Sequence, residues 1–222
     1  MNSFAESEIK EIEKKFGSYE YLLAFRYANL CVKADPQSLL PVTVVVGATG
    51  QNIEEVADVF NMDEYHLAVV PKNQDLLFDI RQALFEAHPE FEVSQEQMDE
   101  DDPASAFLLC KMPDVNKERY DVLVEATKNL HDECKARLDE VLLDEKSGFA
   151  ELMAEEPESL KEVADRLNEK HQEAEASIRD LRDKKLDEIA DAYEKYVSEQ
   201  SGQSQVEVSE EEENVGNRLV LQ

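Results

Sequence analysis

The sequence predicts an α+β fold in which both ends of the chain build one three-helix bundle and the middle forms an inserted β/α/β domain. Two observations carry this prediction. The hydrophobic spacing changes from a helical period to short strand-like runs near residue 40, and it returns to the helical period near residue 113. With 222 residues, of which 42% are hydrophobic, the chain can fill more than one core. We therefore expect the bundle from residues 1–37 and 113–200, the inserted domain from 38–112 and an acidic disordered tail from 201–222.

The first helix is predicted from Ser7 to Lys33. Apolar residues recur there at intervals of three and four, which places them on one helical face. They are Ile9, Ile12, Phe16, Tyr19, Leu22, Leu23, Phe25 and Leu30. The Asp35-Pro36 pair ends this helix, because the residue before proline is pushed away from the helical conformation.

The stretch VTVVVGATGQNIEEV, residues 42–56, raises the possibility of a nucleotide-binding strand, turn and helix. That motif needs a third glycine for close packing of the helix on the strand, and Ile53 stands in its place. Pro71 also closes a second apolar run too soon for a full crossover helix. The pattern favours a strand followed by a tight turn in which glycine supplies a positive φ.

Two long amphipathic helices are predicted after Pro113, at Asn116–Phe149 and at Ser159 to about Val197. Both carry too much charge to be buried all round, so they must pack on each other and on the first helix. The final stretch is rich in glycine, serine and glutamate and has lost the helical period, which predicts disorder from about Ser201.

The charge balance restricts how this chain can bind nucleic acid. The chain has 23 Lys and Arg against 52 Asp and Glu, a formal net charge of −29, so any nucleic-acid contact needs a local basic patch or a basic protein. The 3 cysteines and 4 histidines lack ligand or catalytic spacing, and we expect no catalytic residue, cofactor or metal and no enzyme activity.

Without a membrane span or a leader, we expect no membrane partner and a cytoplasmic protein, with a mitochondrial or plastid location left open.

The order of elements resembles the ribosome recycling factor family. The resemblance is carried by SLLPVTVVVGATGQNIEEVADVFNMDEYHLAVVPKNQDLLFDIRQALFEA and, after an acidic insertion, by MPDVNKERYDVLV. It implies an L-shaped molecule, and in this register GATG is a hairpin turn. It also implies a non-enzymatic factor of translation termination that binds the large ribosomal subunit and acts with elongation factor G, with hinges near residues 35–41 and 112–114. This chain is then a diverged, strongly acidic member.

In that family, basic residues of the helical domain hold ribosomal RNA. Arg26 or Lys33 matches the first of them, while Asp139, Leu142 and Leu143 replace the arginines of a second group in the simplest register. In a second register Arg179 and Arg182 take that place, although alternating charges on a helix are also typical of a solvated face. The candidate ribosome-binding residues are Arg26, Lys33, Arg119, Lys135, Arg137, Arg179 and Arg182.

A second hypothesis remains open. The chain can keep this fold yet act as an acidic binding or assembly partner of a basic protein. Its acidic segments at residues 90–102 and in the tail can steer toward basic surfaces, or can serve only solubility.

Overall fold

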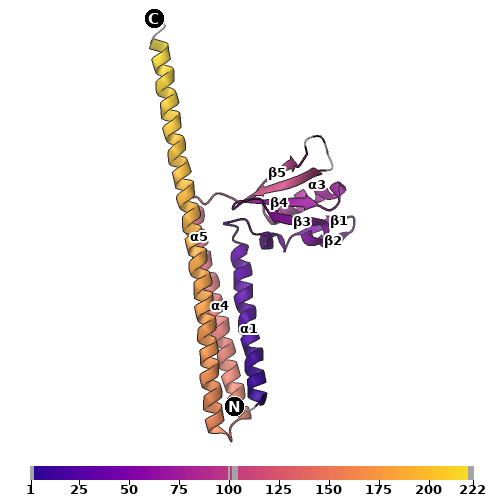
Figure 1. Ribbon diagram of the computed structural model, residues 1–222, viewed down its shortest axis with the longest axis vertical. Helices are drawn as coiled ribbons and strands as arrows, with labels where there is room; N and C mark the ends of the chain where they lie inside the picture. Colours follow the sequence, from indigo (N-terminus) through magenta and orange to yellow (C-terminus); the bar gives the residue numbers. More distant parts are fainter. Residues whose placement is uncertain (1–2, 100, 102–104, 220–222) are drawn as a thin grey trace.

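The structure is a computed structural model that describes the backbone of residues 3–99, 101 and 105–219, and the side chains of residues 5–99, 101 and 105–201. Three long helices form an upright bundle, and the inserted domain projects sideways from its upper part, so the molecule is L-shaped (Figure 1). This arrangement confirms the predicted α+β fold with a bundle drawn from both ends of the chain.

The bundle consists of α1 (Ser3–Ala28), α4 (Lys117–Leu152) and α5 (Pro157–Leu219). Its core is the apolar face that the helical spacing predicted. Members from all three helices are fully buried there, among them Ile12, Phe16, Leu138, Leu167 and Ile178. Asn116 caps α4, because its side chain accepts a hydrogen bond from the Arg119 amide at 2.9 Å.

Helix α1 ends at Ala28, earlier than the expected Lys33. The Asn29 side chain donates to the Phe25 carbonyl at 2.8 Å, and Cys31 takes a left-handed conformation with φ 52°. Cys31 and Val32, which lie within the expected helix, are buried against the inserted domain and the elbow instead. The packing of these two side chains against other elements therefore outweighs the local preference for helix at the C-terminal end of α1.

The inserted domain begins with η1 (Pro36–Leu39) and a hairpin of β1 (Thr43–Val46) and β2 (Thr49–Asn52). The strands are antiparallel, and Val46 pairs with Thr49 across the two-residue turn Gly47-Ala48. Gly47 has φ +65° and occupies the first turn position, where type II′ hairpin turns use glycine. The predicted hairpin turn at GATG is confirmed, and no parallel nucleotide-binding unit starts here.

After α2 (Ile53–Val56), four antiparallel strands form a sheet in the order β3-β4-β6-β5. The strands are β3 (Ala57–Asn61), β4 (His66–Pro71), β5 (Glu92–Gln97) and β6 (Ala106–Lys111). Between β4 and β5 lie η2 (Gln74–Leu76) and α3 (Leu77–Ala87), whose buried face shares one core with the sheet and the β1–β2 hairpin. The acidic segment at residues 90–102 is not all loop, because residues 92–97 form the edge strand β5.

A small third core joins the two arms at the elbow. It contains Val32, Val115, Leu123, Ile189 and Ala192, and Tyr65 of the inserted domain packs against it. The Ala34 amide donates to the Glu64 carbonyl and the Met112 amide to the Tyr65 carbonyl, both at 2.8 Å. Both connecting segments are thus bound to the β3–β4 turn. The chain has already joined the inserted domain at Ala34, so the elbow lies just before the expected hinge at residues 35–41.

Helix α5 runs on to Leu219, which differs from the disordered tail expected from Ser201. Glutamate and glutamine are common in this stretch and are good helix formers, and adding residues to an existing helix avoids the cost of nucleation. Among the described residues, no helix is long and apolar enough to cross a bilayer.

Candidate functional site

A groove of about 190 Å³ runs between α1 and α4 on the bundle surface. Helix α1 contributes residues one turn apart, so they share one face, and α4 contributes a matching face. The lining residues are Tyr19, Leu22, Leu23, Arg26, Leu130, Glu133, Cys134 and Arg137. The structure therefore brings two of the predicted basic residues, Arg26 and Arg137, to one apolar-floored groove.

Both groove arginines carry one acidic partner and remain accessible. Arg26 Nη1 donates to Glu133 at 2.6 Å, and Arg137 Nη1 donates to Glu140 at 2.8 Å. Their side chains are 42% and 63% exposed. Exposed ion pairs contribute little to stability, and a guanidinium has five N–H donors, so each arginine can still bind a phosphate group. The groove thus offers two cations beside exposed apolar side chains.

Lys135 faces away from this groove. It lies two residues from Arg137, and positions two apart on a helix point to different sides. Its ammonium pairs with Glu175 on α5 and lies 3.8 Å from Asp139, and Asp139 also lies 2.8 Å from Nε2 of His171. This network joins α4 to α5, so Lys135 already has two acidic partners.

Two more predicted residues hold the elbow. Arg119 Nη2 donates to the carbonyls of Leu30 and Cys31, each at 3.2 Å. Burial lowers the pKa of Arg119, yet a guanidinium keeps its charge at any physiological pH. Lys33 pairs with Glu64 at 2.5 Å, and its hydrogen bond to that carboxylate raises the pKa of Lys33. Both residues therefore have structural partners in the chain itself.

The α5 pair lies apart from the groove-lining residues. Arg179 is exposed, and among the described side chains no acid lies within ion-pairing distance of it. Arg182 is 28% exposed and pairs with Asp183 at 2.7 Å. Of the residues predicted from the second register, Arg179 is thus the more available to an external anion.

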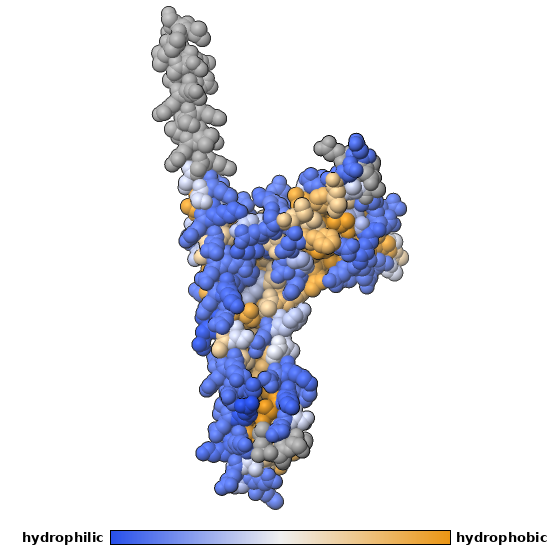
Figure 2. All heavy atoms as spheres, in the orientation of Figure 1, coloured by the Kyte–Doolittle hydropathy of each residue, from blue (hydrophilic) through white to orange (hydrophobic). Residues whose placement is uncertain are grey.

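The sequence did not reveal that apolar side chains gather on the inserted domain. Orange atoms concentrate there, while the bundle surface in the same view is mostly hydrophilic (Figure 2). Phe60 is 54% exposed and Phe78 73% exposed. Alternation in the strands could have indicated Phe60, because its neighbour Val59 packs into the core.

Two clusters with metal-ligand chemistry also escaped sequence analysis. One contains Cys31, His88 and Glu90, and the other contains Asp139, His171 and Glu175. Cys31 and His88 are 57 residues apart, so no local spacing could have indicated that they meet.

Comparison with known proteins gives matches in structure alone. No family model matches the chain, and no curated protein matches by sequence. The solution structure of the ribosome recycling factor superposes with a TM-score of 0.64, at 17% identity over 86% of this chain and 100% of the other. The chain has the fold of ribosome recycling factor.

A second solved structure agrees with this fold. It is described as models for the T. thermophilus ribosome recycling factor and the E. coli elongation factor G bound to the E. coli post-termination complex. The match has a TM-score of 0.54, with 21% identity over 82% of this chain and 98% of that one. Both arms of the recycling-factor fold are therefore present in this chain, from the bundle through the inserted domain.

Proposed function

We propose that this protein is a non-enzymatic ribosome-binding factor that promotes the release or splitting of ribosomes after termination. The observation that carries the proposal is the fold match over the whole of a ribosome recycling factor, with both arms present. The groove between α1 and α4 adds to it, because it holds two exposed arginines, Arg26 and Arg137, each with unused N–H donors, on a chain whose net charge is −29. Such a site is what contact with a phosphate backbone requires.

In this proposal the bundle binds ribosomal RNA of the large subunit and the inserted domain moves. The elbow core is small, and only two connecting segments join the inserted domain to the bundle. The inserted domain can therefore rotate about the elbow. An elongation factor G type of partner would push on the inserted domain while the arginines hold the bundle. The acidic side chains must lie away from the bundle surface that contacts RNA, because charges interact over a Debye length of about 8 Å at physiological salt.

Co-sedimentation with purified ribosomes tests the proposal. We compare the full chain with a variant carrying Arg26→Glu and Arg137→Glu, over a series of salt concentrations. Loss of two phosphate contacts should weaken pelleting and reduce the slope of log K against log salt by about 2. A matched control carries Lys14→Glu and Arg166→Glu, which make the same charge change at exposed bundle positions outside the groove.

The control should pellet like the unaltered chain. Equal loss in the control and the groove variant would show that only net charge matters. Pelleting that neither variant changes would contradict a groove-mediated contact. Absence of pelleting by the full chain at low salt would overturn ribosome binding itself.

A second candidate function is an acidic binding or assembly partner of a basic protein. It is favoured by the internal use of Arg119 and Lys135, which leaves fewer cations for RNA, and by the exposed apolar side chains of the inserted domain. Exposed apolar side chains on a chain with a net charge of −29 suit a basic amphipathic partner. Retained binding to basic ribosomal proteins, without binding to ribosomal RNA, would favour this function.

A further inference from the structure

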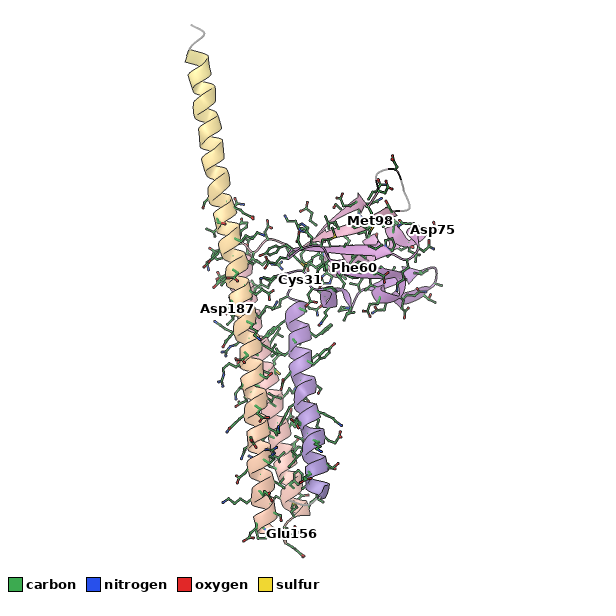
Figure 3. All side chains as sticks on the ribbon, viewed as in Figure 1. Cys31, Phe60, Asp75, Met98, Glu156 and Asp187 are labelled. Carbon is green, nitrogen blue, oxygen red and sulfur yellow. The ribbon has the colours of Figure 1, made fainter. Side chains whose placement is uncertain are left out.

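Three metal-ligating side chains meet at the elbow, on segments far apart in the sequence. Cys31 follows the end of α1, His88 follows α3 and Glu90 lies two residues further on. Cys31 is labelled in Figure 3, where the chain leaves α1 for the inserted domain. Its Sγ lies 4.0 Å from His88 Nδ1, and that nitrogen lies 3.1 Å from Glu90 Oε1. All three ligand atoms lie within 4.8 Å of one another.

The His88 ring is held in a ligating orientation. Its Nε2 lies 3.2 Å from the Ser38 carbonyl oxygen, which can only accept, so Nε2 carries the hydrogen. The ring also stacks on Phe91, with centroids 4.5 Å apart and an interplanar angle of 16°. Nδ1 therefore faces Cys31 and Glu90, where it can carry a proton or give its lone pair to a metal ion. A second hydrogen-bonded partner of this kind is typical of metal-binding histidines.

The contact between His88 Nδ1 and Glu90 requires a cation. A lone pair and a carboxylate oxygen at 3.1 Å are both acceptors, so a proton or a metal ion must lie between them. A proton satisfies this one contact. A metal ion would in addition bind the Cys31 sulfur, which lies on the same side of the ring nitrogen.

We propose that Cys31, His88 and Glu90 form a zinc-type metal site at the elbow. Sulfur, imidazole nitrogen and carboxylate oxygen are the donors that Zn²⁺ takes in tetrahedral sites. Its bond lengths place tetrahedral ligand atoms about 3.4–3.6 Å apart. The observed 4.0 Å and 3.1 Å separations reach these values by shifts of a few tenths of an ångström, and the sulfur–carboxylate separation, at most 4.8 Å, has to close by up to about 1.2 Å. The fourth position is left for water on the side of Glu90, which is 38% exposed.

The ligands supply negative charge for a divalent cation. A thiolate and a carboxylate give two negative charges, and these have to outweigh the repulsion of the nearby Arg119 guanidinium and Lys185 ammonium. Burial raises the pKa of the Cys31 thiol to about 11, so metal binding at neutral pH must release its proton. The left-handed backbone of Cys31, φ 52°, is a strain that structures keep where a side chain must be held in place.

The second cluster, of Asp139, His171 and Glu175 in the bundle, differs because it already contains a cation. Between Asp139 and Glu175 lies the Lys135 ammonium, which already supplies a cation beside His171. A metal ion there would have to displace this lysine. The two clusters thus provide a candidate site and an internal comparison within one chain.

A metal ion at this site would fix the elbow. Cys31 belongs to the segment that leaves the bundle, whereas His88 and Glu90 follow a helix of the inserted domain. Coordination would cross-link the two segments and restrict rotation of the inserted domain. This inference does not depend on ribosome binding, and it adds a ligand that the proposed function does not include.

Titration of the reduced full chain with Co²⁺, and competition by Zn²⁺, tests the site. Cobalt bound to thiolate gives a charge-transfer absorption band, so the band reports Cys31 directly. We expect one equivalent to bind, Cys31→Ser to abolish the band, and Glu90→Gln to weaken binding by at least about tenfold. Matched controls are Cys134→Ser, another buried thiol, and His171→Gln in the second cluster. Both should bind metal like the unaltered chain.

Melting curves without metal show whether each variant folds. Glu90→Gln changes an accessible side chain and should melt like the unaltered chain. Added Zn²⁺ should raise the melting temperature of the unaltered chain and leave that of Glu90→Gln almost unchanged. The inference is overturned if the folded chain gives no thiolate band, or if the band survives Cys31→Ser and disappears in Cys134→Ser. In the first case a proton alone bridges His88 and Glu90.

Discussion

Arg119 on α4 holds the backbone of Cys31: its Nη2 donates to the Cys31 carbonyl at 3.2 Å, and to the Leu30 carbonyl at the same distance. These carbonyls lie just beyond the end of α1, where the helix leaves backbone acceptors without partners. A positively charged group is suited to this end of a helix. The contact also fixes the left-handed residue from which the chain enters the inserted domain.

We expect Arg119→Met to lower the free energy of unfolding by about 2 kcal/mol, because two hydrogen bonds from a charged donor are lost while the side-chain volume is nearly kept. Arg119→Lys should recover only part of this, since one ammonium cannot reproduce the guanidinium fork. Urea denaturation measures both values. Arg166→Met, at an exposed arginine of α5, serves as the control. Equal stability of the Arg119 and Arg166 variants would contradict the structural role.

The role of Arg119 shows where sequence analysis reached its limit. The two changes of hydrophobic period predicted the bundle and the inserted domain, because those patterns reflect which side chains each element buries. The glycine at position 47, after a run of β-branched residues, likewise predicted the hairpin turn. Basic residues on helices gave no such indication, since a charge on a helix suits a phosphate ligand and an internal partner equally well.

Part of the site was predictable from spacing alone. Lys135 and Arg137 lie two apart on one helix, so they could not both face the groove. The meeting of Arg26 with Arg137 depends on how α1 packs against α4, and that of Cys31 with His88 on how the inserted domain folds back. Contacts of this kind between distant segments leave no local pattern in one sequence.

Stability should fall at alkaline pH because of the buried thiols. Burial raises the pKa of Cys110 from 9.0 to about 12, and that of Cys134 from 9.0 to about 11. A raised pKa means that the thiol ionises first in the unfolded chain, so this contribution is complete below pH 9 and is lost as the pH rises above it. Each thiol can change the free energy of unfolding by up to about 1.4 kcal/mol per pH unit.

We expect the free energy of unfolding to stay constant up to about pH 9 and to decline from there to pH 10. Urea denaturation at each pH measures it. This window ends below the ordinary lysine pKa of about 10.4, so most lysines keep their charge within it. Cys110→Ala should be less stable overall but should show a shallower decline. A decline of the same steepness in that variant would mean that other groups cause it.

Two glycines should respond in opposite directions to alanine. Gly47 needs its φ of +65° for the hairpin turn, so Gly47→Ala should destabilise by about 1–2 kcal/mol. Gly17 lies within α1 and a Cβ there meets nothing within 4 Å, so Gly17→Ala should stabilise by about 1 kcal/mol. Thermal melting measures both. Destabilisation by Gly17→Ala would show that α1 has a closer neighbour at this position than the structure contains.

Tyr65 links the two arms, and its removal should loosen the elbow. Its ring packs against both the inserted-domain core and the elbow core, and the Lys195 ammonium on α5 lies 3.7 Å from the ring centroid. A cation over an aromatic ring contributes about 0.5–2 kcal/mol, which is enough to shift the balance between docked and rotated arrangements. The backbone carbonyl of Tyr65 would still accept from Met112, so the β3–β4 turn should persist.

We expect Tyr65→Ala to broaden the distribution of distances between a dye on the inserted domain and a dye on the bundle, as measured by single-molecule energy transfer. Lys195→Met keeps much of the side-chain stem but removes the charge, and it should broaden the distribution less. Tyr21→Ala removes a 65% exposed ring of α1 and should leave it unchanged. If Tyr65→Ala gives the same distribution as Tyr21→Ala, the elbow is held by the aliphatic core of Val32, Val115 and Ile189 rather than by this ring.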